Sequence, residues 1–230
     1  MTYPEFCIIS IGTLSTNTLW NEQSEKRTGH GTTTLVSVGN EHLIVNPSLP
    51  PSALLARLSE RTSIQPEQIT RVFLTSFDVE QRRGISAFPD AVWLMYETEL
   101  EAAAETLELR HREALADENL TLAKLYEQDL AILNRIEPAP DKVLANVDLF
   151  PLPGVTPGSC GLLLSEARRT ILICGDAIPS NEHLQRAEVL SSAWDVKLAQ
   201  EAFKEAAEIA DVIVPGRDNL ILNPLRAVFS

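Results

Sequence analysis

Residues 97–136 contain neither glycine nor proline and are rich in alanine, leucine and glutamate. This composition favours helix along the whole segment. We expect two helices that meet near residues 116–119 and end before the run "EPAPD". The apolar side chains of the second helix share one face: Leu122, Tyr126, Leu130 and Leu133. Any fold for this chain must therefore accommodate a long helical segment between its two other parts.

The apolar face of this helical segment must be buried against something. Packing against the rest of the chain is the simplest solution. A contact between two copies in a homodimer, or a lid over a neighbouring pocket, would bury the same face. The sequence leaves these alternatives open.

The chain on either side of the helical segment is typical of β-strands that alternate with helices. Residues 32–38 and 43–47 flank a turn with Gly39 and Asn40, which predicts a hairpin. Further apolar strands are expected at residues 6–12, 71–77, 90–96, 147–154, 160–166, 168–176 and 211–216. Helices are expected at residues 52–63 and 192–210, the second with Ser192 as its N-cap. This alternation predicts sheets covered by helices within a single domain, residues 1–230.

Composition narrows the classes of function. The net charge of −13 repels phosphate backbones, so we expect no nucleic-acid partner. No run approaches the roughly 20 consecutive apolar residues of a membrane span, and the first residues lack a signal-peptide pattern. The cytoplasm is therefore the expected compartment. The three cysteines contain no C-x-x-C pair and are expected to be buried free thiols.

Four short stretches follow one another in a recognisable order: "LTSFDVEQRRG", "LPGVTPGSCG", "ILICGDAI" and "DVIVPGRDN". Their order and spacing resemble the metallo-β-lactamase superfamily, and the hairpin "TTTLVSV…LIVNPSLP" extends the resemblance upstream. The resemblance covers most of the chain except residues 97–136, which would be a helical insertion. It implies a four-layer αββα sandwich and a parent activity of metal-assisted hydrolysis of an ester, thioester or lactam bond.

In relatives the four motifs read T-H-x-H-x-D-H, G-H-T, G-D and P-G-H, and they hold two metal ions. The resemblance assigns the first metal site to Ser76, Asp78 and Val155, the second to Glu80, Gln81 and Arg217, and the bridging position to Asp176. Only Asp176 has the residue type that the family uses. Asn46 likewise replaces the aspartate of the V-D-P that ends the family's opening hairpin.

These replacements oppose metal binding. Zinc binds imidazole nitrogen, thiolate or carboxylate, and Val155 offers no lone pair. The guanidinium of Arg217 remains charged in a protein and repels a dication. We therefore expect no metal or other cofactor, and a non-catalytic protein that binds a small molecule or a protein partner. We also expect Arg217 to pair with Asp176 or Glu80 and to take the place of a metal ion.

Two enzymatic alternatives stay open. Asp78, Glu80 and Asp176 could hold one Mn²⁺, Mg²⁺ or Zn²⁺ through oxygen and retain hydrolase activity. A metal-free enzyme could instead use His183 with Asp176 for acid–base catalysis. The plainer interpretation of His183 is an exposed histidine at a helix start. The run "TPGSCG" lacks the G-x-S-x-G pattern of a nucleophile, and we assign Ser159 and Cys160 to structure.

Overall fold

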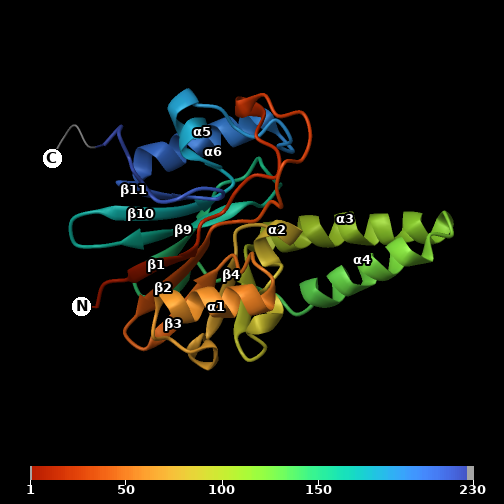
Figure 1. The fold of residues 1–230 in the computed structure, drawn as a ribbon, viewed down its shortest axis with the longest axis horizontal. Coiled ribbons are helices and arrows are strands. Elements are labelled where there is room, and N and C mark those ends of the chain that lie inside the picture. Colours follow the sequence, from red (N-terminus) through yellow and green to blue (C-terminus); the bar gives the residue numbers. More distant parts are fainter. Residues whose placement is uncertain (1, 227–230) are drawn as a thin grey trace.

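The computed structural model describes residues 2–226 and contains two β-sheets packed face to face, with helices on both outer faces (Figure 1). Apolar side chains of both sheets fill the space between them, among them Phe73 and Leu43 from one sheet and Leu162 and Ile171 from the other. This arrangement confirms the predicted αββα sandwich. None of the helices in residues 2–226 is long and apolar enough to cross a membrane.

The first sheet has six strands in sequential order: β1 (Glu5–Ser10), β2 (Thr33–Val38), β3 (Glu41–Val45), β4 (Arg71–Leu74), β5 (Val92–Met95) and β6 (Glu137–Pro138). The pairs β1–β2 and β2–β3 are antiparallel, and the pairs from β3 to β6 are parallel. The predicted hairpin is confirmed, with Gly39 at φ 61° in its turn.

The second sheet also has six strands, in the order β12-β11-β10-β9-β8-β7. They are β7 (Lys142–Leu144), β8 (Val147–Pro151), β9 (Cys160–Ser165), β10 (Thr170–Gly175), β11 (Val212–Pro215) and β12 (Ile221–Leu222). All neighbours are antiparallel except β10 and β11, which are parallel. The sequence did not predict β6, β7 or β12, because strands of two or three residues carry no periodicity.

Helices cover both sheets. On the first sheet lie α1 (Pro51–Arg61), α3 (Glu97–Ala116) and α4 (Leu120–Leu133); α5 (Asn181–Arg186) and α6 (Val196–Ile209) cover the second. The short helix α2 (Val79–Arg82) follows β4, and three 3₁₀ turns occupy Thr18–Trp20, Pro66–Gln68 and Ile85–Ala87. Helix α6 buries a face of small side chains and Phe203 against β10 and β11, which its amphipathic sequence predicts.

Helix α6 begins later than predicted. Its N-cap is Asp195, whose carboxylate accepts hydrogen bonds from the backbone N–H groups of Lys197 (2.9 Å) and Leu198 (3.0 Å). The expectation that Ser192 caps this helix is therefore wrong. The backbone N–H groups of Trp194 and Asp195 donate instead to the carbonyls of Val155 and Gly154. This contact holds the chain in a non-helical path until Asp195.

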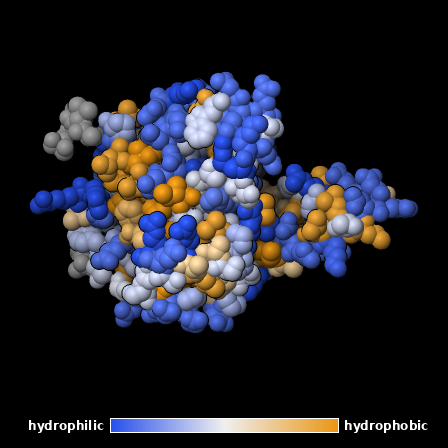
Figure 2. Space-filling view, viewed as in Figure 1, coloured by the Kyte–Doolittle hydropathy of each residue, from blue (hydrophilic) through white to orange (hydrophobic). Residues whose placement is uncertain are grey.

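Helices α3 and α4 form an antiparallel hairpin that projects from the sandwich (Figure 1), and the predicted break near residues 116–119 is confirmed. Near the base, Leu133 is buried and Tyr126 and Leu130 pack against the core of the first sheet. Further out the hairpin carries apolar side chains that are about half exposed or more: Leu109, Leu115, Leu120 and Leu125. Figure 2 shows hydrophobic (orange) areas on the surface of the projecting hairpin. Core packing thus accounts for the base of the apolar face.

Candidate functional site

Four loops converge at one edge of the two sheets, next to the ends of β4, β8, β10 and β11. They carry the four motifs of the sequence. A cavity of about 560 Å³ lies between them, and five of the seven positions expected at the site line it: Asp78, Glu80, Val155, Asp176 and Arg217. The other two, Ser76 and Gln81, are buried and do not line this cavity.

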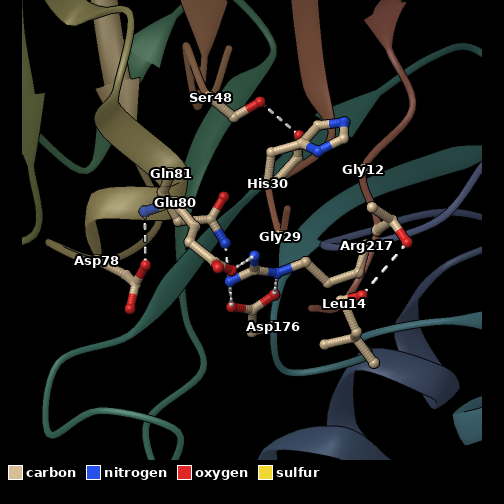
Figure 3. Close-up of polar contacts among 12 residues, drawn as sticks. Gly12, Leu14, Gly29, His30, Ser48, Asp78, Glu80, Gln81, Asp176 and Arg217 are labelled. Atoms are coloured by element: carbon tan, nitrogen blue, oxygen red, sulfur yellow. Dashed lines mark hydrogen bonds and ion pairs between the residues drawn. The ribbon is translucent and has the colours of Figure 1, made fainter. Parts of the chain in front are cut away.

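Arg217 occupies the centre of this group (Figure 3). Its Nε and Nη2 donate to the two carboxylate oxygens of Asp176, at 2.8 and 2.7 Å, and its Nη1 donates to Glu80. The side chains of Arg217 and Asp176 are only 5% and 8% exposed. The sequence predicted a pairing of Arg217 with Asp176 or Glu80, and the structure contains both contacts.

The ion pair changes the protonation equilibria of both partners. Burial alone would raise the pKa of Asp176, but the charge and hydrogen bonds of Arg217 outweigh it and hold this pKa below its usual value. Burial would likewise lower the pKa of Arg217, but the Asp176 carboxylate outweighs burial and raises it. Both groups are therefore charged at neutral pH.

Helix α2 positions the remaining acidic side chains. Asp78 is its N-cap and accepts from the backbone N–H of Glu80 at 2.7 Å. Gln81 donates from Nε2 to Asp176 at 3.0 Å, while its Oε1 is buried and has no hydrogen-bond partner among residues 2–226. A Cβ at Gly31 would lie 1.9 Å from that Oε1, so a larger residue there would force the Gln81 side chain to move.

Asn46 links the ends of two neighbouring strands of the first sheet. It is buried at φ 49°, a left-handed conformation that asparagine tolerates better than most residues. Its Nδ2 donates to the hydroxyl of Thr75, and its Oδ1 accepts from the Thr75 backbone N–H, both at 2.9 Å. These contacts tie the end of β3 to the end of β4.

His183 lies on α5 and lines the same cavity, although it is only 2% exposed. The interpretation of His183 as an exposed helix-start residue is therefore wrong. Its Nδ1 lies 2.9 Å from the Ser180 hydroxyl, while both carboxylate oxygens of Asp176 accept hydrogen bonds from Arg217. Within residues 2–226 the hydrogen bond of His183 Nδ1 is therefore made with Ser180, and not with Asp176, its partner in the metal-free enzyme alternative.

Glu99, in the first turn of α3, escaped the sequence analysis. It is 3% exposed and accepts hydrogen bonds from the Phe77 N–H (3.0 Å), the Thr156 hydroxyl (2.7 Å) and the Gly158 N–H (3.1 Å). It therefore joins α3 to the first two motif loops. No local pattern distinguishes it from the exposed glutamates around it, because its partners lie far away in sequence.

The three cysteines are free; Cys160 and Cys174 are buried as predicted, whereas Cys7 is only partly buried, so the prediction of burial is wrong for Cys7. Burial raises the pKa of the Cys160 thiol, so this residue is not poised as a nucleophile. The neighbouring Ser159 donates its hydroxyl to the Leu152 carbonyl at 2.7 Å and shapes the turn. Across residues 2–226, no three His, Cys, Asp or Glu side chains form a group that could hold a metal ion.

Solved structures of known proteins share this fold. A protein of Thermotoga maritima described as a candidate metallo-β-lactamase superimposes with a TM-score of 0.67 at 16% identity, over 96% of this chain and 99% of that chain. A mutant of AiiA from B. thuringiensis, solved with N-decanoyl-L-homoserine at its active site, gives 0.66 at 19% identity, over 95% and 94%. AidC, a dizinc quorum-quenching lactonase, gives 0.60 at 16% identity, over 77% and 67%.

At these identities the structural likeness establishes the fold and not the activity. No curated protein sequence matches the chain. The sequence profile of the metallo-beta-lactamase superfamily, however, matches residues 27–217, which include the first three motifs and the fourth as far as Arg217. The chain therefore belongs to the metallo-β-lactamase superfamily.

Proposed function

We propose that this chain is a metal-independent member of its superfamily that binds a small molecule in the 560 Å³ cavity and does not catalyse hydrolysis. The observation that carries the proposal is the position of Arg217. Its guanidinium bridges Asp176 and Glu80, two positions that correspond to metal ligands in relatives. A fixed side-chain cation thus balances carboxylates that a metal would otherwise neutralise.

The side chains at the other ligand positions also fit a metal centre poorly. Val155 has no donor atom, and Gln81 directs its N–H donors, not a lone pair, at Asp176. In relatives a bound metal lowers the pKa of water and so supplies the attacking hydroxide. Nothing in this donor set provides an equivalent, which supports a binding role.

A single oxygen-bound ion at Asp78, Glu80 and Asp176 is the competing proposal. Both oxygens of Asp176 and one of Glu80 already accept hydrogen bonds from Arg217. Asp78 also accepts the backbone N–H that starts α2. An ion would have to displace the Arg217 guanidinium from Asp176 and Glu80, and the backbone N–H of Glu80 from Asp78. The hydrogen bonds would be lost, and the guanidinium and the metal cation would repel each other.

The metal content of the purified chain tests the proposal. After dialysis against micromolar Zn²⁺, Mn²⁺ and Mg²⁺, plasma mass spectrometry is expected to find far less than one equivalent of each. The variant Arg217→Ala frees Asp176 and Glu80, so it should gain a metal ion or lose about 3–5 kcal/mol of stability through the unpaired buried carboxylate.

The matched control is Arg110→Ala, which removes an exposed arginine of α3 outside this cavity and should change neither quantity. Near one equivalent of metal in the unaltered chain would overturn the proposal in favour of the single-ion hydrolase. An Arg217→Ala variant with unchanged stability and no metal would show that the ion pair does not replace a metal.

A further inference from the structure

We propose that the cavity takes a small organic amine in its ammonium form, with the Nε2 atom of His183 and the carboxylates of Asp78 and Glu80 as its hydrogen-bond acceptors. The inference rests on the proposed metal-free binding function and names the class of ligand. Two independent features of the cavity lead to it, the tautomer of His183 and the balance of charge.

A chain of three polar side chains fixes the tautomer of His183. The hydroxyl of Ser180 donates its single proton to Glu182 Oε2, at 2.8 Å. The same hydroxyl oxygen lies 2.9 Å from Nδ1 of His183, so it must accept there, and Nδ1 must carry the proton. A neutral imidazole protonated on Nδ1 has its lone pair on Nε2.

This lone pair has no partner within residues 2–226. No hydrogen bond reaches Nε2 of His183, although the residue is only 2% exposed and lines the cavity. Burial also lowers the pKa of His183, which keeps the ring neutral near pH 7. Nε2 is not one of the fully buried, unpartnered polar atoms of residues 2–226, so it keeps access to the cavity, where an N–H group of a ligand can donate to it.

The charge of the cavity selects the kind of donor. Three carboxylates line it, those of Asp78, Glu80 and Asp176, against the single guanidinium of Arg217, so two negative charges remain unbalanced. The Nε, Nη1 and Nη2 atoms of Arg217 already donate hydrogen bonds to Asp176 and Glu80. These two carboxylates neutralise the guanidinium, so it attracts an anionic ligand only weakly. An ammonium group supplies both positive charge and three N–H donors.

The size of the cavity favours an organic cation over a bare ion. A volume of about 560 Å³ lies within the range of small-molecule sites. The lining also includes hydroxyl side chains that could bind further polar groups, and apolar side chains that could cover a short methylene chain: Thr16, Thr18, Ser191, Leu14, Val155 and Leu190.

Calorimetry with probes of equal length tests this inference. Putrescine, succinate and butanediol carry the same four-carbon chain with two positive charges, two negative charges and none. Putrescine is expected to bind, and more weakly as salt rises, because its charges are screened. Succinate and butanediol are expected not to bind. Binding of succinate as tight as that of putrescine, or no binding of putrescine, would overturn the inference.

Variants test the role of His183. His183→Phe keeps a ring of similar size but removes the acceptor, and should weaken putrescine binding by about tenfold or more. The matched control His111→Phe alters a histidine of α3 outside the cavity and should leave binding unchanged. Circular dichroism would first establish that the unaltered chain and His183→Phe are both folded. Equal putrescine affinity of the two would then contradict the role of His183 as a hydrogen-bond acceptor.

A further measurement does not depend on how well that variant folds. A long-range ¹H–¹⁵N spectrum of the unaltered protein should place the proton of His183 on Nδ1, and Ser180→Ala should shift the ring toward the other tautomer and weaken putrescine binding. A proton on Nε2 in the unaltered protein would overturn the inference. If the purified chain holds no metal and does not bind putrescine, only the proposed class of ligand is refuted. If the chain holds one equivalent of metal, the proposed metal-independent function is refuted.

Discussion

At the scale of single residues, Arg217 and Asp176 form a buried ion pair in which each partner compensates the charge of the other. Removing water from two charged groups costs about as much as their attraction returns, so such a pair contributes little net stability. Its effect is local: it fixes Asp176, Glu80 and Gln81 in one arrangement. The sequence predicted the pairing, because an arginine in the last motif accompanies acids in the first. It could not predict the two-pronged geometry, which depends on where the loops after β10 and β11 meet.

His183 gives a prediction about pH at the same scale. Burial lowers its pKa below the ordinary 6.5; Glu182, Glu188 and Asp176 offset part of this effect, and Arg186 adds to it. The folded state therefore binds fewer protons than the unfolded state just below pH 6.5, so stability should fall as the pH drops through this region. Urea unfolding at pH 7.5 and 5.5 should show a larger loss for the unaltered chain than for His183→Phe. Equal losses would contradict the prediction.

At the scale of elements, the first turn of α3 is held to two motif loops by one buried carboxylate. Glu99→Ala would leave the N–H groups of Phe77 and Gly158 without their acceptor, which should cost about 2–4 kcal/mol. Urea unfolding measures this loss. The matched control is Glu105→Ala on the exposed side of α3, with an expected change below about 0.5 kcal/mol. A similar small cost for both variants would show that Glu99 does not anchor the helix.

Sequence periodicity predicted the type of each long element but not the contacts that set its ends. Helix α6 was expected from its amphipathic pattern, and it exists. The helix begins after its N-cap Asp195, later than predicted, because the backbone N–H groups of Trp194 and Asp195 donate hydrogen bonds to the loop that contains Gly154 and Val155. The same loop holds Glu99 through Thr156. The helix propensity of a segment depends on its own residues, so it does not reveal contacts with segments far away in the sequence.

At the scale of the whole molecule, the resemblance of four short motifs to the metallo-β-lactamase superfamily implied two stacked sheets with helices outside them. Each motif follows a strand, and the strands that precede them meet at one edge of the sandwich, so the chemistry-bearing loops had to converge there. Convergence of loops does not determine which side chains face the cavity. Ser76 and Gln81 are buried outside it, whereas His183, seven residues beyond Asp176, lines it.

The projecting hairpin of α3 and α4 leads to a prediction about local stability. Its base packs on the core of the first sheet through the buried Leu133 and the partly buried Leu100, whereas its outer part carries the exposed Leu120 and Leu125. Because burial decides the cost of local opening, amide hydrogen exchange should quicken from base to tip, while β10 exchanges slowest. Slow exchange along the entire hairpin would contradict this gradient. A protection of the tip that rises with protein concentration would instead point to a second copy covering these leucines.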